Sequence, residues 1–159
     1  MTVAPEFEAT IQWPLTRKGD RGHPVSTLQH LLRHHDHDIA VDGIFGPKTD
    51  AAVREFQEHE HLDIDGIAGP HTWSALIVTV RRGDEGDAVR GVQQEAVDRS
   101  GDPDHPALVI DGIFGPKTEA FVEGFQEALR DSFPEDGIAV DGIVGPVTWR
   151  AFIGGFLLG

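Results

Sequence analysis

The sequence predicts an all-α protein of two tandem small three-helix bundles, with minimal or no sheet. Two observations predict this fold class. Nearly the same eight residues occur four times, as DGIFGPKT at 42–49, DGIAGPHT at 65–72, DGIFGPKT at 111–118 and DGIVGPVT at 141–148. The residues after the Gly-Pro pairs are apolar at every third or fourth position, which is the period of a helix that buries one face.

The spacing of the four copies divides the chain into two units. Asp42 and Asp65 are 23 residues apart, whereas 46 residues separate Asp65 from Asp111, so the copies group in pairs. Each unit closes with a similar tryptophan motif, GPHTWSALI in the first and GPVTWRAFI in the second. We therefore predict an N-terminal extension at 1–15, unit one at 16–77, unit two at 80–153 and a C-terminal tail at 154–159.

Three helices are expected in each unit. A proline is tolerated in the first helical turn, because the N–H that it lacks has no intrahelical partner there. In unit one the predicted helices cover 24–34, 47–59 and 70–77. In unit two they cover 87–99, 116 to beyond Phe125, and 146–153. Each unit is expected to close its own small core.

The Asp-Gly pair in each copy predicts a turn. Aspartate can accept hydrogen bonds from nearby backbone amides and glycine can adopt a positive φ, so the turn at 42–43 should tuck Ile44 inside. Asp-Gly between apolar residues also signals a β-hairpin, but a proline opens each following segment. At most a short bridge is expected, between 40–41 and 64 or between 139–140 and 109–110.

The termini and two insertions are expected to lie at the periphery. Trp13 and Pro14 should cover unit one, while the apolar tail at 156–158 should pack on unit two or on a neighbour. Unit two is longer than unit one at 98–108 and at 127–140. Insertions collect in exposed connections, so both segments are predicted to be loops.

Composition excludes several classes of partner. The chain has 13 Lys and Arg against 27 Asp and Glu, a net charge of −14. Nucleic acids and anionic membrane surfaces need clustered basic residues, so neither is an expected partner. No segment approaches the roughly 20 apolar residues of a membrane span, and no signal peptide is visible at the start. The absence of cysteine excludes thiolate metal sites and thiol nucleophiles.

The order of motifs resembles the three-helix peptidoglycan-binding domain family over nearly the whole chain. The motifs are Gly-Asp-x-Gly, Val-x-x-Leu-Gln, DGIFGPKT, Val-x-x-Phe-Gln and Asp-Gly-Ile-x-Gly-Pro-x-Thr-Trp. Modules of that family commonly accompany cell-wall hydrolases and phage lysins, and a related unit occurs in metalloprotease propeptides. The resemblance implies non-catalytic binding of bacterial peptidoglycan, outside the cell or at its wall. The segments flanking the two units are too short for a catalytic domain, so any wall hydrolase is expected to act in trans.

Ligand binding is expected around the Asp-Gly turns. Stem peptides end in carboxylates, which helix N-termini attract, and Lys48 and Lys117 would add positive charge. Aromatic edges at Phe45 and Phe114 would cover apolar parts of the stem, and the glutamines would anchor either the ligand or the Asp-Gly loop. The candidate ligand-binding residues are Gln29, Asp42, Gly43, Phe45, Lys48, Gln57, Gln93, Asp111, Gly112, Phe114, Lys117 and Gln126.

Catalytic and metal sites are weaker alternatives, and we expect no cofactor. Five histidines could meet at one end of unit one, where imidazoles suit zinc or nickel; they are His34, His35, His37, His59 and His61. Their positions follow the ends of two helices, which are exposed connectors. Acidic pairs such as 63 with 65 and 102 with 104 are expected by chance in so acidic a chain, and no serine lies in a nucleophile elbow. The alternative functions are a protein-interaction or inhibitory module that reuses the fold, and a zinc-dependent wall hydrolase.

Overall fold

The computed structural model describes residues 5–100 and 108–158, and this part of the chain folds into seven helices joined by turns and loops. The helices are α1 (Pro5–Thr10), α2 (Val25–His34), α3 (Pro47–His59), α4 (Pro70–Leu76), α5 (Asp87–Arg99), α6 (Pro116–Ser132) and α7 (Pro146–Ile153). The described residues form isolated β-bridges but no sheet. The all-α prediction is confirmed, and α1 is a helix that the sequence did not predict.

The Gly-Pro pairs start helices as predicted. In α3, α4, α6 and α7 the glycine is the N-cap residue with an extended backbone, and the proline occupies the first helical turn. None of these four N-termini receives a capping hydrogen bond from a side chain. First-turn N–H groups, which have no partner within a helix, therefore lack a side-chain cap at four equivalent places.

Short bridges do occur, but the expected pairs were wrong. Thr16 pairs with Ala68 and Val80 pairs with Val144. Arg21 and Glu85 pair with the isoleucine that follows an Asp-Gly turn, Ile44 in unit one and Ile113 in unit two. The partner of each turn is thus the segment that leads into the unit.

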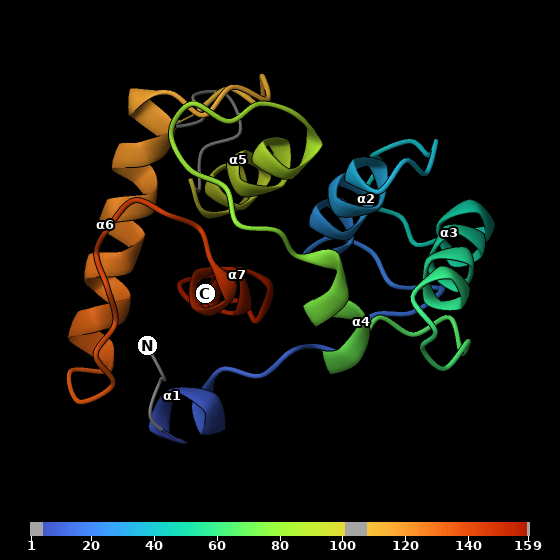
Figure 1. The fold of residues 1–159 in the computed structure, drawn as a ribbon, viewed down its shortest axis with the longest axis horizontal. Coiled ribbons are helices and arrows are strands. Elements are labelled where there is room, and N and C mark those ends of the chain that lie inside the picture. Colours follow the sequence, from blue (N-terminus) through green and yellow to red (C-terminus); the bar gives the residue numbers. More distant parts are fainter. Residues whose placement is uncertain (1–4, 101–107, 159) are drawn as a thin grey trace.

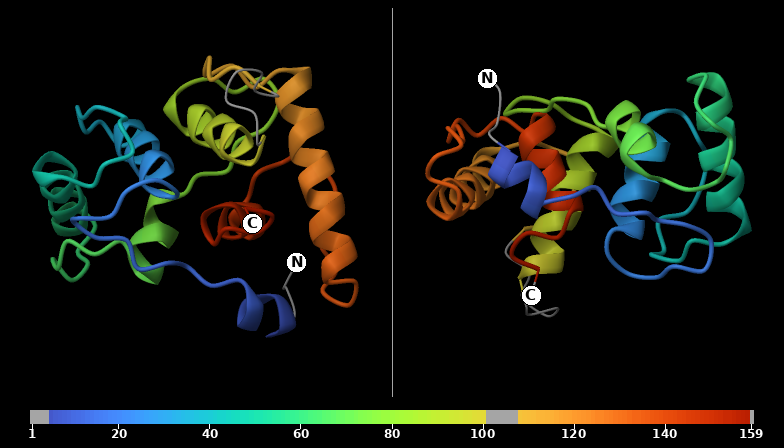
Figure 2. Two further views of the ribbon diagram at one scale, coloured as in Figure 1. Left: turned by 180° about the vertical axis from the view of Figure 1, so that it is seen from behind. Right: turned by 90° about the horizontal axis from the view of Figure 1, so that it is seen from below.

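The two units lie side by side, and their first helices meet between them. Figure 1 shows α2, α3 and α4 on one side and α5, α6 and α7 on the other, with α2 facing α5. The pair α2 and α5 makes the most extensive contact between helices among the described residues. The view from below in Figure 2 shows α1 against unit two, far from α3.

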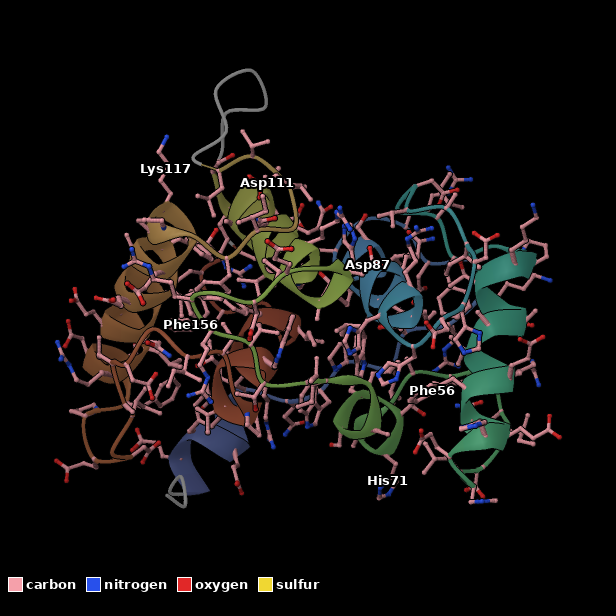
Figure 3. All side chains as sticks on the ribbon, turned by 45° about the horizontal axis from the view of Figure 1, so that its top comes forward. Phe56, His71, Asp87, Asp111, Lys117 and Phe156 are labelled. Atoms are coloured by element: carbon pink, nitrogen blue, oxygen red, sulfur yellow. The ribbon has the colours of Figure 1, made fainter. Side chains whose placement is uncertain are left out.

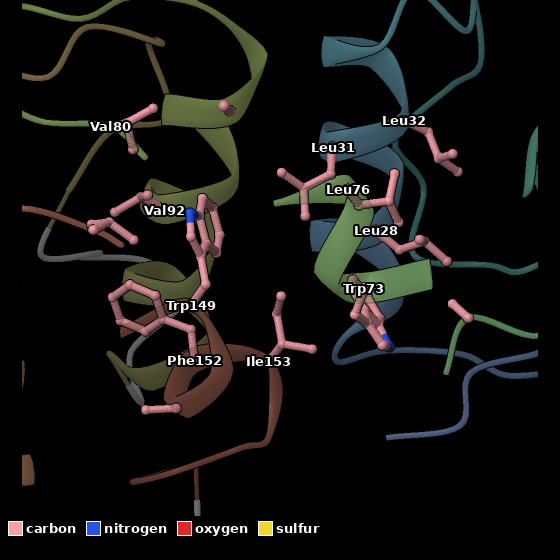
Figure 4. Close-up of a cluster of buried hydrophobic side chains, with 14 of the residues drawn as sticks. Leu28, Leu31, Leu32, Trp73, Leu76, Val80, Val92, Trp149, Phe152 and Ile153 are labelled. Atoms are coloured by element: carbon pink, nitrogen blue, oxygen red, sulfur yellow. The ribbon is translucent and has the colours of Figure 1, made fainter. Parts of the chain in front are cut away.

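The buried side chains form one continuous core, where the sequence predicted two separate ones. Trp73 and Leu28 in unit one and Trp149 and Phe152 in unit two are fully buried and belong to the same apolar cluster. Figure 4 shows Leu31 and Ile153 between these two groups. Units of this size hide too little of their own surface for high stability, and sharing a core increases the apolar area that they bury.

The N-terminal segment spans both units. Phe7 of α1 is buried against Phe133 of unit two, edge to face at 5.5 Å. Farther along, Trp13 stacks on Trp73 of unit one at 6.5 Å, so the predicted cover of unit one is confirmed. At the other terminus Phe156 packs on Phe125, as expected of the tail.

The predicted loop at 127–140 is wrong in its first half. Residues up to Ser132 continue α6, which has 17 residues where its counterpart α3 has 13. Leu129 in this added turn is fully buried, and Phe133 directly after it is 6% exposed. Apolar contacts on unit two therefore extend the helix. Most of the other insertion, 101–107, lies outside the described residues.

Candidate functional site

A buried glutamine organises each Asp-Gly turn. In the first turn the Gln29 amide oxygen accepts the backbone N–H groups of Asp42 (3.1 Å) and Gly43 (3.0 Å). Its amide nitrogen donates to the Asp42 carboxylate (2.9 Å), to the Ile44 carbonyl (3.1 Å) and to the Thr49 hydroxyl (3.1 Å). Gln29 is 1% exposed, so these internal bonds satisfy an amide that would be costly to bury alone.

The same arrangement recurs in the other three copies. Gln57, Gln93 and Gln126 are equally buried and donate to the aspartates at 65, 111 and 141 at 2.9 to 3.1 Å. The four turn glycines have φ between 73° and 77°, a conformation that side chains rarely adopt. The sequence left open whether the glutamines anchor the ligand or the loop. In the structure the glutamine side chains hydrogen-bond to the Asp-Gly loops.

Three of the turn aspartates, Asp42, Asp65 and Asp111, have a lowered pKa that favours their charged form. The backbone N–H of Ile44 is the main cause that lowers the pKa of Asp42 below its ordinary value, and the Gln29 amide adds to it. The pKa of Asp111 is lowered in the same way by the N–H of Ile113 and then by Gln93. Asp65 also has a lowered pKa, chiefly through the N–H of Ile67. These carboxylates are structural acceptors that face solvent, with their charge retained.

Two predicted side-chain positions are reversed. Ile44 was expected inside but is 42% exposed, whereas Phe45, expected at the surface, is 1% exposed. In unit two Ile113 is 54% exposed and Phe114 is 1% exposed. Extended backbone turns successive side chains to opposite sides, so one of the two residues faces out when the other faces in. Two backbone bonds to the lead-in segment fix the register, from the Phe45 N–H to the Asp20 carbonyl and from the Gly22 N–H to the Gly43 carbonyl.

Each of the four turns borders a hollow in the surface, which we number in chain order. The first, of about 390 Å³, lies between the Asp42 turn and the start of α3. The second (about 400 Å³), third (about 500 Å³) and fourth (about 170 Å³) lie at the corresponding places before α4, α6 and α7. Every hollow is bounded by the turn aspartate, the buried glutamine and the Gly-Pro helix start. The sequence repeat is therefore a repeat of surface hollows.

The first and third hollows each contain a lysine. Lys48 lines the first hollow beside Ile44, and Lys117 lines the third beside Ile113. Both lysines are exposed, and no ion pair within the described residues involves either of them. Figure 3 shows Lys117 extending outward from the first turn of α6. A cation and an apolar side chain therefore sit together at each of these two hollows.

The predicted site residues divide into two groups. Gln29, Asp42 and Lys48 meet in the first hollow, and their counterparts Gln93, Asp111 and Lys117 meet in the third. Gln57 and Gln126 line the second and fourth hollows. The turn glycines at 43 and 112 shape the backbone, and the phenylalanines at 45 and 114, which were expected to offer aromatic edges to a ligand, are instead buried in the core.

Several lining residues were missed by the sequence prediction. They include Leu15 and His71 in the second hollow and Ile138 and Val147 in the fourth. His71 is the second residue of α4 and points away from the protein in Figure 3. The sequence could have indicated these two hollows, because the second and fourth copies of the repeat resemble the first and third.

The histidines of unit one do not gather into a metal site within the described residues. His35 bonds to the Leu76 carbonyl at 2.9 Å and lies against Phe56, while His37 faces Glu55 at 3.6 Å. The described part of the chain has one group of three side chains spaced for a cation, which is His23, Glu95 and Asp98. There the Arg99 guanidinium lies 2.7 Å from Glu95, so this group is already an ion-pair network.

Taken together, the fold and its turns define a tandem of two small helical modules, each built on two copies of one glutamine-anchored Asp-Gly turn. Residues 21–76 and 86–152 each match the family described as "Putative peptidoglycan binding domain". The chain therefore belongs to this family of peptidoglycan-binding domains, with two copies in tandem.

Curated relatives carry a similar region within longer proteins. A zinc D-Ala-D-Ala carboxypeptidase of Streptomyces albus G is 37% identical over 107 residues, which cover 67% of this chain and 37% of that protein. The N-acetylmuramoyl-L-alanine amidase CwlM of Mycobacterium tuberculosis is 30% identical over 158 residues, covering 85% and 36% respectively. The chain thus spans little more than a third of the length of these relatives.

Among solved structures, the SleB N-terminal domain shares 38% sequence identity with this chain. The match covers 40% of this chain and 88% of that domain, with a TM-score of 0.39.

Within residues 5–100 and 108–158, every helix is too short or too polar to cross a bilayer.

Proposed function

We propose that this chain binds bacterial cell-wall peptidoglycan through its two modules and does not itself catalyse a reaction. The observation that carries the proposal is the presence of two family modules on one body, each with the same kind of hollow. The matched regions of relatives named as a carboxypeptidase and an amidase cover only part of those proteins, which supports a binding role.

The first and third hollows are the proposed ligand contacts. A stem peptide combines carboxylates with apolar side chains, and each of these hollows combines a lysine with an exposed isoleucine. The uncapped first turn of the adjoining helix adds partial positive charge. Local contacts of this kind would let a chain of net charge −14 hold an anionic ligand.

Location follows from the ligand. A protein that binds peptidoglycan works at the cell wall, so we propose that the chain acts outside the cell membrane. A wall hydrolase that works in trans is a compatible partner. The bound chain would raise the affinity of the hydrolase for the wall, and the hydrolase would supply the catalysis.

The test is co-sedimentation with purified wall sacculi. We expect the chain to be depleted from the supernatant, and Lys48→Gln combined with Lys117→Gln to weaken the binding several-fold. The control is Lys18→Gln, which is compared with each single lysine variant, because it removes one positive charge from an exposed lysine that lines none of the four hollows. A wild-type chain that stays in solution with excess sacculi contradicts the proposal. A fall in sacculus turbidity during the incubation contradicts its non-catalytic part.

A further inference from the structure

The two units pack through equivalent helices. Gln29 and Gln93 hold the same place in their units, so α2 and α5 correspond residue by residue with an offset of 64. His30 and Gln94 are therefore equivalent positions, and they meet each other across the interface at 3.3 Å. Equivalent positions that touch mark an approximate two-fold axis between the units, as in an isologous dimer.

A fully buried carboxylate lies beside this axis. Glu95 of α5 is 0% exposed and accepts hydrogen bonds from His23 Nε2 (2.9 and 3.0 Å) and from the Thr27 hydroxyl. Both donors belong to unit one. His23 Nε2 also lies 3.1 Å from the carbonyl oxygen of Phe152 in unit two. Two donors of unit one thus converge on acceptors of unit two.

Unit two holds this carboxylate in place from its own side. Arg99, one turn farther along α5, donates to Glu95 at 2.7 Å. Its guanidinium also donates to the carbonyl oxygens of Phe152 (3.1 Å) and Phe156 (2.9 Å) and lies over the Phe125 ring at 5.1 Å. Because Arg99 is fixed by several contacts within unit two, it orients Glu95 from that unit's side of the interface.

The contact that the approximate two-fold axis relates to the Glu95–Thr27 contact is apolar. The two halves of the interface therefore differ in chemistry. The counterpart of Glu95 is Leu31, fully buried, and the counterpart of Thr27 is Gly91. A Cβ at Gly91 would lie 3.3 Å from Trp149, so a larger side chain in this half of the interface would require the Trp149 ring to shift. A rotation or a slide of one unit would separate the buried Glu95 carboxylate from His23 and Thr27 and leave Arg99 as its donor, and the loss of hydrogen bonds to a buried charge is unfavourable.

The N-terminal segment ties the same two units a second time. Arg150 of unit two donates to the carbonyl oxygens of Glu8 (2.8 Å) and Ile11 (2.6 Å). Five residues after Ile11, Thr16 pairs with Ala68 of unit one through two backbone hydrogen bonds. The segment therefore limits the same relative motion that the Glu95 network resists.

From these contacts we propose that Glu95 is a positioning residue, which fixes the two modules at one separation and orientation so that they bind the repeating wall polymer as a rigid two-site body. This proposal rests on the proposed function. Two linked sites gain affinity for a repeating ligand only when their separation matches its repeat, and a fixed geometry preserves that gain. A small soluble fragment occupies one module and would not report the orientation.

The variant Glu95→Gln keeps the side-chain volume and removes the charge, and Thr27→Val keeps the shape and removes one donor. Spin labels at Glu58→Cys on α3 and Glu127→Cys on α6 report the distance between the units, since both residues are exposed and the chain has no cysteine. Val53→Ala is the matched control, because it loosens a buried site of unit one on α3, away from the contact between α2 and α5. All of these variants are made in the full chain, and circular dichroism confirms folding.

We expect one narrow distance distribution for the wild type and for Val53→Ala, and a broadened one for Glu95→Gln and Thr27→Val. Sacculus affinity should fall on the order of tenfold in Glu95→Gln, while the affinity for a soluble disaccharide-peptide fragment stays unchanged. A narrow distribution in Glu95→Gln, or equal broadening in Val53→Ala, overturns the positioning role. Broadening without loss of sacculus affinity overturns the rigid two-site binding. A wild type that binds neither sacculi nor fragment overturns the proposed function instead, and the distances still decide the role of Glu95.

Discussion

The indole N–H of Trp149 donates a 2.7 Å hydrogen bond to the carbonyl oxygen of Val78, 71 residues earlier in the chain. Trp73 makes the same bond to Pro14 at 3.1 Å. Each tryptophan thus closes its unit on the segment that leads into it. Because Val78 follows α4 of unit one almost directly, the bond that closes unit two also fixes the point where the units join.

Replacing this tryptophan tests the closure. Trp149→Phe removes the N–H and part of a fully buried ring, so the Val78 carbonyl loses its partner and a small cavity forms. We expect a loss of about 2–3 kcal/mol in the free energy of unfolding, measured by urea denaturation. A loss below about 0.5 kcal/mol would show that the closing contact adds little, since surface substitutions have effects of that size.

The reversed pair at positions 44 and 45 gives a test within two adjacent residues. Phe45→Ala should destabilise the fold by about 3–5 kcal/mol, because it empties a buried site. Ile44→Ala should change stability by less than about 0.5 kcal/mol, because the side chain is already exposed. Thermal and urea unfolding of both variants measures the difference. Comparable losses in the two would place both side chains in the core, contrary to the structure.

Replacing the buried glutamine at an Asp-Gly turn should lower the free energy of unfolding. Gln57→Ala removes the hydrogen bonds to the Asp65 turn and leaves buried backbone groups unpaired, for an expected loss of about 3 kcal/mol. Gln12→Ala is the control, since Gln12 is exposed and makes one local bond. Equal stability of the two variants would mean that the turn holds its shape without its glutamine.

Acid should loosen the turns. The pKa values of Asp42, Asp65 and Asp111 are lower in the folded chain than the ordinary 3.8, so the unfolded chain binds protons more readily. Their contribution to stability is complete above that ordinary value and disappears as the pH falls through the folded pKa values. Urea unfolding from neutral pH to about pH 3 should show this decline.

The matched variants for the acid effect are Asp42→Asn and Asp111→Asn. The asparagine oxygen can still accept the N–H groups of Ile44 and Ile113, but it does not titrate in this range. The double variant should therefore lose less stability on acidification than the wild type does. A decline as steep as in the wild type would assign the acid sensitivity to other groups.

Much of the fold could be read from local signals. The Gly-Pro pairs at 46–47 and 115–116 predict helix starts, because proline has a fixed φ and needs no hydrogen bond in the first turn. The Asp-Gly pairs predict turns for equally local reasons. By contrast, α1 carries no repeat motif, and its place is set by contacts such as Phe7 with Phe133, which lie far apart in the sequence.

Some residues that line the hollows could be named from the sequence, whereas the side-chain directions at the turns could not. Lys48 and Lys117 were identified from the repeat, and both line hollows. The inward or outward direction of Ile44 and Phe45 was missed, because it depends on a backbone bond to Asp20 in the lead-in segment. A shift of one residue in extended chain exchanges the two faces, and the sequence near the turn does not reveal that partner.

By itself the sequence determined two helical units, four repeated turns and membership of a peptidoglycan-binding family, since each follows from short motifs whose conformation is set by proline, glycine and local hydrogen bonds. Tertiary structure alone decided that the units share one core, that Glu95 meets His23 and Thr27 across the interface, and that the N-terminal segment reaches unit two. The physical reason is that burial and ion pairing depend on which surfaces meet, and residues distant along the chain come together only when the whole protein folds.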